Sequence, residues 1–193
     1  MELKRVVITG IGAISPLGAT ARETWEAVVA GKSGAGPITI FDASKFKTTF
    51  ACEVKEFDVS KYIDKKEARR LDRYAQFAMV AAEECIADSK IDVEQINKNR
   101  VGVIIASGIG GLGTFEEEVR GYNAESGPRF NPFFIPKMIS DISAGHVSMK
   151  YGFHGPNYST ASACASSTNA LIDACHLIRL GKADVIITGG AEA

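Results

Sequence analysis

The sequence predicts an α/β fold built around a mostly parallel sheet. Three short apolar runs, Arg5–Ile8, Val101–Ala106 and Ala183–Thr188, are rich in β-branched residues and are separated by helical stretches. A run that is apolar throughout, without alternation, is typical of a strand buried on both faces. Buried strands that alternate with helices favour parallel pairing, because a parallel connection needs a long crossover.

Composition is that of a globular protein. The 193 residues are 46% hydrophobic and 23% charged, which excludes a disordered chain. The formal net charge of −1 argues against bulk binding to nucleic acid or to an anionic membrane. No apolar run approaches the length of a membrane span, and no signal-like core follows the charged start. We therefore expect a cytoplasmic protein.

The cysteines indicate neither a metal site nor a disulfide framework. The chain has four of them, Cys52, Cys85, Cys164 and Cys175, and their spacing fits no zinc pattern. We expect a reducing compartment and no bound metal.

In the first part of the chain, a helix is predicted from Thr20 to about Ala30. Thr20 and Glu23 have the spacing of a capping box, and Gly31 provides the stop. Residues 33 to 60 show no sustained period, so we expect an excursion from the main sheet, a cap region reaching to about residue 75. A long helical stretch with room for one break follows, over Ile63–Ser89.

In the second part, the strand Val101–Ala106 leads into a glycine cluster and an acidic helix start at residues 116 to 118. Asn131–Pro136 is predicted to be an irregular apolar loop before a helix near Lys137–Tyr151. A further helix is predicted over Thr168–Leu180, ended by Gly181. The chain then stops soon after its last strand without a covering helix, which is typical of a piece of a longer fold.

Cys164 is the candidate nucleophile. It lies among small residues directly before the helix predicted over Thr168–Leu180. The first turn of a helix exposes backbone N–H groups, and the macrodipole adds roughly half a positive charge there. Both effects favour a thiolate over a thiol, which is how a cysteine becomes nucleophilic. The alternative is a buried cysteine in a small-residue turn, since free cysteine is among the most buried residue types.

The glycine cluster Gly108–Gly113 fits the dinucleotide-binding pattern G-x-G-x-x-G between a strand and a helix. Such a site also needs an acidic residue after the next strand, roughly 20 residues on, to bind the ribose. The sequence offers only Phe130 to Phe133 there, and no strand. We therefore interpret the glycines as allowing tight turns and close packing beside a site, and we predict no cofactor.

Four cations, Lys66, Arg69, Arg70 and Arg73, have the spacing of one helix face. Such a run is usually a solvated face, and the alternative is a docking surface for an acidic partner. The histidines supply no evident base for Cys164. His176 lies twelve residues along the same helix, about 18 Å away. His146 and His154 are predicted to be structural positions in a helix and a turn.

Motifs along the whole chain, in order, resemble the β-ketoacyl-acyl carrier protein synthases, and most closely the type II branch (KAS II). The motifs are Val6–Gly12 with Ser15–Gly18, Ser107–Gly113, Pro132–Pro136, Ala144–His146, Tyr151–Gly152 with Gly155–Pro156, Ala163–Ser166, and Ala183–Val185 with Gly189–Glu192. The resemblance implies a thiolase-like layered fold (αβαβα) of two similar halves, in which residues 1–193 match the N-terminal half and the C-terminal half is absent.

The resemblance also implies the chemistry. Cys164 is expected to accept the growing acyl chain from acyl carrier protein as a thioester. Malonyl-acyl carrier protein then loses carbon dioxide, and its carbanion attacks the acyl group in a decarboxylative Claisen condensation. The backbone N–H of Cys164 forms half of the oxyanion hole. The family's catalytic histidines, its lysine and the second oxyanion N–H belong to the other half, so residues 1–193 alone are not expected to condense substrates.

Three further expectations follow from the resemblance. Ile109 and Phe134 match positions that shape and gate the acyl pocket, with Phe134 reaching in from the partner of a homodimer. Lys66, Arg69 and Arg70 match positions that meet acyl carrier protein. For these cations, the resemblance therefore favours a docking surface for an acidic partner over a solvated face.

Three alternatives stay open at this point. A polyketide-type ketosynthase shares the cysteine turn and differs in the loops around the pocket. A non-catalytic chain-length subunit has the same fold but lacks the cysteine, so Cys164 argues against it. A Rossmann-type oxidoreductase would use the glycine cluster, but the sequence lacks the ribose-binding acid.

Overall fold

The computed structural model describes residues 3–122, 127 and 130–193. Its centre is a three-stranded sheet in the order β4-β3-β5, formed by β3 (Val101–Ala106), β4 (Asn157–Tyr158) and β5 (Val185–Gly190). Both pairings with β3 are parallel, with Val103 opposite Asn157 on one side and Ile187 on the other. The predicted α/β fold with a parallel sheet is confirmed.

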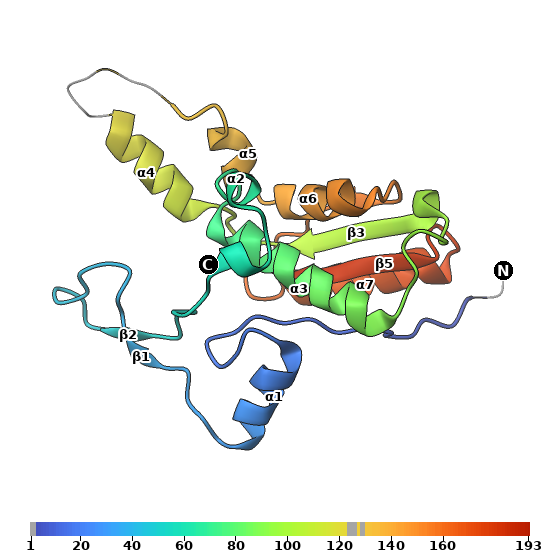
Figure 1. The fold of residues 1–193 in the computed structure, drawn as a ribbon, viewed down its shortest axis with the longest axis horizontal. Coiled ribbons are helices and arrows are strands. Elements are labelled where there is room, and N and C mark those ends of the chain that lie inside the picture. Colours follow the sequence, from blue (N-terminus) through green and yellow to red (C-terminus); the bar gives the residue numbers. More distant parts are fainter. Residues whose placement is uncertain (1–2, 123–126, 128–129) are drawn as a thin grey trace.

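Helices cover both faces of the sheet, as Figure 1 shows. On one face, Val103 and Ile105 of β3 share a core cluster with α3 (Arg73–Ser89) and α6 (Ile142–Tyr151). On the other face, Ile104 and Ala106 pack with residues of α7 (Ser166–Arg179). Because side chains alternate along a strand, one fully buried strand joins the two helical layers.

An ion pair fixes the start of the sheet. Arg100 belongs to a 3₁₀ turn, η2 (Lys98–Arg100), and Asp184 directly precedes β5. The Arg100 guanidinium donates two hydrogen bonds to the Asp184 carboxylate, at 2.6 and 2.8 Å. These bonds lower the pKa of Asp184 to about 2. The bidentate contact aligns β5 with β3 where the two strands begin.

The first helix, α1 (Ala21–Val29), has the predicted ends. Thr20 Oγ1 accepts a hydrogen bond from Glu23 N at 3.1 Å, and Gly31 takes a positive φ of 68° after the last turn. The Glu23 carboxylate accepts from Ala19 N, one residue earlier than a capping box requires. The cap is therefore a variant of the predicted one.

The long helical stretch is broken once, as the sequence allowed. A single turn, α2 (Lys65–Ala68), is separated from α3 by residues 69–72. Asp72 caps α3 by accepting from Tyr74 N, while the Gln76 side chain donates to the Ala68 carbonyl at 3.0 Å. The break places Arg69 and Arg70 outside any helix.

The strand predicted over Arg5–Ile8 is wrong. These residues form no strand, and the side chains of Val7 and Ile8 are 60% and 80% exposed. The chain that follows packs against α3 instead of the sheet. Ile11 N donates to Asp88 and Ala13 N to Glu84, both at 2.9 Å. Carboxylates of a helix thus take the hydrogen bonds that a neighbouring strand would have taken.

The remaining elements differ from expectation in detail. The loop predicted over Asn131–Pro136 contains the start of a short helix, α5 (Phe134–Met138), so the single helix expected to begin near Lys137 is two helices. The last strand begins two residues later than predicted, and Ile187 is its one buried hydrophobic residue. The strand β4 had no signal in the sequence.

The segment over residues 33–60, predicted as an excursion, contributes no strand to the three-stranded sheet. It contains a short antiparallel pair, β1 (Gly36–Pro37) with β2 (Phe50–Ala51), and a 3₁₀ turn, η1 (Val59–Lys61). Figure 1 shows this pair and α1 away from the main sheet, with α4 (Leu112–Tyr122) projecting in another direction. Within the described ranges, no helix combines the length and apolarity needed to cross a bilayer.

Gly12→Ala is expected to destabilise the fold. A Cβ atom on Gly12 would lie 2.0 Å from the Ala81 carbonyl oxygen, so the N-terminal segment must move away from α3. Overpacking of this kind costs about 1–3 kcal/mol of unfolding free energy, measurable by chemical denaturation.

Gly113→Ala is the matched control, because a Cβ atom there meets no atom within 4 Å. It should retain the full unfolding free energy or gain up to about 1 kcal/mol from helix propensity. Equal stability of the two variants would contradict the close packing of Gly12 on α3.

Candidate active site

The candidate site lies at one edge of the sheet. Parallel strands end at the same edge, which is where ligands bind in open α/β sheets. The segment after β3 contains the glycine cluster, the segment after β4 contains Cys164, and the segment after β5 contains Glu192. The topology therefore brings together three segments that are far apart in the sequence.

Cys164 lies on a sharp turn that leads into α7. Ala163 adopts a left-handed backbone conformation with φ of 50°, which is unfavourable for a residue with a Cβ atom. The buried hydroxyl of Ser166 holds this turn. It accepts from Ser162 N at 2.8 Å and donates to the Ala163 carbonyl at 2.7 Å. Ala165 N also donates to Ser162 O, which closes the turn.

The turn leaves Cys164 exposed. Within the described residues, neither its thiol nor its backbone N–H forms a hydrogen bond with another protein group. Among the described residues, Cys164 is thus not part of the hydrophobic core. An accessible sulfur beside a free N–H at the start of a 14-residue helix can accept an acyl group and stabilise negative charge on its oxygen.

The other cysteines lie in different settings. Cys85 is half-buried, its thiol donates to the Gly10 carbonyl, and burial raises the pKa of that thiol. Cys175 is half-buried within α7, and Cys52 is exposed in the excursion. Within the described residues, no cluster of histidine, cysteine or carboxylate side chains could hold a metal ion.

The three histidines have other places in the fold. His154 precedes β4, at the opposite edge from Cys164, and its Nδ1 lies 3.2 Å from Asn99 Oδ1. His146 is on α6, which packs on the face of the sheet opposite α7, and burial lowers the pKa of its imidazole. His176 lies in the last turn of α7, far along the helix from Cys164.

The glycine cluster forms a tight turn instead of a phosphate cradle. Gly110 has a positive φ of 79°, and a Cβ atom there would lie 2.3 Å from the Met138 carbonyl oxygen. Gly111 N donates to that same oxygen at 2.9 Å. The interpretation of tight turns and close packing is confirmed. Ile109, at the tip of the turn, is 63% exposed.

A carboxylate missed by sequence reasoning holds the start of this turn. Glu192 accepts from Gly108 N at 2.7 Å and from the buried Ser107 hydroxyl at 3.3 Å. The Ser107 hydroxyl in turn accepts from Gly110 N at 2.9 Å. The sequence signal for Glu192 was only its place after a strand, where side chains gather at the edge of a parallel sheet.

Phe134 lies in the first turn of α5 and is half-buried. Its ring stacks on Phe130 at 5.6 Å between centroids and lies 6.2 Å from Phe115 of α4. Because Gly111 bonds to the Met138 carbonyl at the end of α5, the segments that carry Ile109 and Phe134 are in contact.

The helix break changes the predicted basic face. The cations at 66, 69, 70 and 73 do not share a helix, so the prediction that they form one basic helix face is wrong. Lys66 and Arg69 are exposed, and neither forms an ion pair with another described residue. Arg70 lies over the Phe133 ring, 5.0 Å from its centroid.

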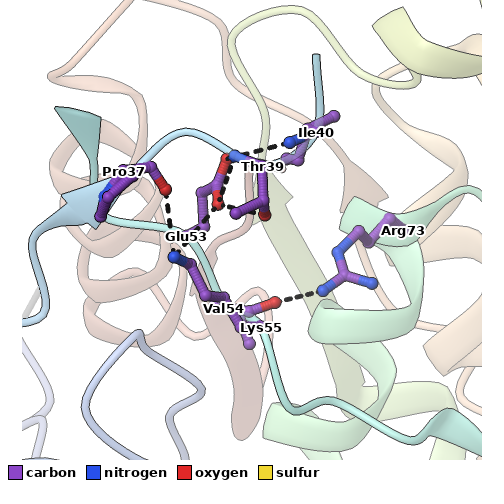
Figure 2. Close-up of polar contacts among 7 residues, drawn as sticks. All are labelled: Pro37, Thr39, Ile40, Glu53, Val54, Lys55 and Arg73. Atoms are coloured by element: carbon purple, nitrogen blue, oxygen red, sulfur yellow. Dashed lines mark hydrogen bonds and ion pairs between the residues drawn. The ribbon is translucent and has the colours of Figure 1, made fainter. Parts of the chain in front are cut away.

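Arg73 turns away from this surface. Its guanidinium donates to the Val54 carbonyl, as Figure 2 shows, and lies over the rings of Phe57 and Phe77. A hollow of about 370 Å³ opens beside it, lined by Thr39, Ile40, Glu53, Val54, Lys55 and Arg73. The Glu53 carboxylate accepts from Thr39 and Ile40, and Lys55 donates to the Pro37 carbonyl. These contacts link residues 37–40 to residues 53–55, so the polar groups around the hollow bind one another.

Ser166→Ala tests how the cysteine turn is held. Loss of the buried hydroxyl removes the acceptor of Ser162 N and one of the two donors to the Ala163 carbonyl, which keeps Ser166 N as its other donor. Each lost hydrogen bond costs about 0.5–1.5 kcal/mol of unfolding free energy. We expect a lower denaturation midpoint and a changed rate of Cys164 alkylation by iodoacetamide. Ser167→Ala removes an exposed neighbouring hydroxyl and should leave both unchanged. Equal effects of the two variants would contradict the role of Ser166.

The sequence is similar to those of known condensing-enzyme synthases. The family model described as "Beta-ketoacyl synthase, N-terminal domain" matches residues 3–193. The chain is 44% identical over 190 residues to 3-oxoacyl-[acyl-carrier-protein] synthase 2 of Staphylococcus aureus, covering 98% of this chain and 46% of that protein. It is 43% identical over 194 residues to the enzyme of the same name from Synechocystis, again covering 46% of the relative. The chain thus spans about half the length of the curated relatives it matches.

Solved structures share the fold. The ishigamide ketosynthase/chain length factor superimposes with a TM-score of 0.89 at 25% identity, covering 99% of this chain and 48% of that one. A ketosynthase bound to its type II PKS acyl-carrier protein and a hexaketide gives 0.83 at 27% identity, covering 98% and 51%. The parallel α/β architecture is therefore that of the N-terminal half of the thiolase-like fold. With its match over residues 3–193, the chain belongs to the β-ketoacyl synthase family.

Proposed function

We propose that this chain is the cysteine-bearing half of a β-ketoacyl-acyl carrier protein synthase that elongates fatty acids. The observation that carries the proposal is the exposed Cys164 on its strained turn at the start of α7. The identity of 44% to a 3-oxoacyl-[acyl-carrier-protein] synthase 2 supports the same activity.

In the proposed reaction, the Cys164 sulfur attacks the carbonyl carbon of an acyl thioester on acyl carrier protein. The bond to the carrier sulfur breaks, and the carrier leaves as its thiol. Malonyl-acyl carrier protein then loses carbon dioxide, and the electron pair of the broken C–C bond becomes a carbanion. This carbanion attacks the acyl-Cys164 carbonyl and forms the new C–C bond, while the bond from that carbonyl carbon to sulfur breaks. Cys164 leaves as its thiolate, and the β-ketoacyl chain stays on the carrier that brought the malonyl group.

Residues of this chain would hold the acyl group in both steps. The unpartnered N–H of Cys164 can donate to the carbonyl oxygen while negative charge develops on it. Ile109 and Phe134 would line the acyl pocket, where each buried methylene group contributes about 0.8 kcal/mol. Phe134 would enter the pocket of the partner in a homodimer.

General acid–base work would come from residues outside 1–193. None of the three histidines supplies an evident base for Cys164: His154 precedes β4, His146 lies on the helix α6, and His176 lies in the last turn of α7. We therefore assign the catalytic histidines, the lysine and the second oxyanion N–H to the other half of the thiolase-like fold.

Acyl carrier protein would dock on the exposed cations Lys66, Arg69 and Arg70. Their freedom from ion pairs with described residues leaves them available to an acidic partner. The complex of a ketosynthase with its acyl-carrier protein among the similar structures supports a partner of this kind.

A polyketide-type ketosynthase is the second candidate, because the similar solved structures include a type II PKS ketosynthase at 27% identity. The higher identity of 43–44% to synthases named 3-oxoacyl-[acyl-carrier-protein] synthase 2 favours fatty-acid elongation.

Cys164→Ala tests the proposed nucleophile in the complete natural polypeptide. Incubation with an acyl thioester should add one acyl group to the wild type, located on Cys164 by peptide mass spectrometry. The variant should gain no acyl mass and show no condensation. Cys52→Ala, which removes the other exposed cysteine, should retain both. Acylation at another residue, or elongation by Cys164→Ala, would refute the proposal.

Reversal of Arg69 and Arg70 to Glu tests the docking surface. We expect KM for acyl carrier protein substrates to rise about tenfold, because two attractive charges become repulsive. KM for a small acyl thioester should stay at the wild-type value. Reversal of the exposed Lys45 and Lys47 to Glu is the matched control and should change neither constant. An equal rise for both substrates in the Arg69/Arg70 variant would point to misfolding and contradict docking.

A further inference from the structure

The turn that carries Ile109 is held at both ends by carboxylates. Glu192 accepts from Gly108 N at the start of the turn, as described above. At its far end, where α4 begins, Asp72 accepts from the Thr114 hydroxyl at 2.5 Å and from Thr114 N at 3.3 Å. The first contact joins the turn to the strand layer, and the second joins it to the break between α2 and α3.

Asp72 serves two helix starts at once. One carboxylate oxygen accepts from Tyr74 N and caps α3, while the other binds Thr114 in the first turn of α4. A carboxylate between two helix N-termini is favoured by both macrodipoles. Thr114 is 5% exposed, so its hydroxyl has little access to water as a substitute acceptor.

Close packing leaves the turn little freedom to move independently of Asp72. A Cβ atom on Gly111 would lie 2.9 Å from the Asp72 carboxylate and 2.6 Å from the Lys137 carbonyl oxygen. Next to Asp72, the buried Tyr74 donates its hydroxyl to the Ile139 carbonyl at 2.5 Å, just beyond α5. Residues 72 and 74 thus bind both the segment of Ile109 and the segment that follows Phe134.

We propose that Asp72, acting through Thr114, is a positioning residue that sets the depth of the acyl pocket. The inference rests on the proposed function, in which Ile109 and Phe134 line that pocket. Asp72 touches no substrate. It fixes the backbone from which Ile109 projects, so its contact with Thr114 matters for acyl chains long enough to reach Ile109 and matters less for an acetyl group.

The test compares two acyl donors in the complete natural polypeptide. Rates of Cys164 acylation by acetyl- and decanoyl-N-acetylcysteamine are followed by intact-protein mass spectrometry, and the decanoyl-to-acetyl ratio is the readout. These donors lack the carrier protein, so docking does not enter. Thr114→Val keeps the shape of the side chain and the cap on α3 but removes the hydroxyl that donates to Asp72.

Thr114→Val is expected to lower the ratio about tenfold, since a hydrogen bond to a charged group is lost. Thr114→Ser restores a hydroxyl and should restore most of the ratio. Asp92→Asn is the matched control, because Asp92 also accepts from a backbone N–H, that of Glu94, but lies outside the turn. It should keep the wild-type ratio. Asp72→Asn, which retains one acceptor for the cap, replaces Thr114→Val if that variant fails to fold.

A wild-type ratio in folded Thr114→Val, or an equal fall of both rates, overturns the positioning role while leaving the proposed function intact. A wild type that gains no acyl group on Cys164 from either donor refutes the proposed function itself, and the positioning role with it.

Discussion

The burial of β3 on both faces is the constraint on which the rest of the structure depends. Five of its six residues are hydrophobic and all six are buried, so helices must cover both sides of the sheet. β3 can pair in parallel with a strand on each side only if long connections return the chain to the end of the sheet where β3 begins. Those connections deliver Cys164 and Glu192 to the edge at which β3 itself ends. The candidate site is thus a product of strand direction.

Carboxylates fasten the segments that have no strand partner. Backbone N–H groups outside regular structure, and those in the first turn of a helix, still need acceptors. In this chain the acceptors are often acidic side chains. The backbone N–H donates to the carboxylate in the pairs Ile11–Asp88, Ala13–Glu84, Ala21–Glu84, Thr39–Glu53, Gly108–Glu192 and Thr114–Asp72. A charged acceptor makes a stronger bond than a neutral carbonyl, which suits single contacts outside a ladder.

Local rules predicted the elements that local forces decide. The ends of α1 and α7 followed from Thr20 and Gly181, and the buried strand at Val101–Ala106 followed from its unbroken apolar run. The place of Cys164 just before a helix also followed from local pattern, since α7 begins at Ser166. Long-range contacts were beyond such rules. The run Arg5–Ile8 has strand composition, yet Gly10 and Gly12 let the following chain pack on α3, which no local pattern reveals. The spacing of Arg69 and Arg70 indicated one helix face, but an Asp72 cap restarts the helix after them.

The left-handed alanine before Cys164 has a consequence for how the site works. Glycine would adopt this backbone angle without strain, but it would also leave the turn free to sample other shapes. Alanine restricts those shapes, and the Ser166 hydroxyl selects one of them. The entropy of ordering the sulfur is therefore lost once, when the chain folds, and not again each time a reactant arrives. The strained backbone at Ala163 thus lowers the entropy cost of reaching the transition state.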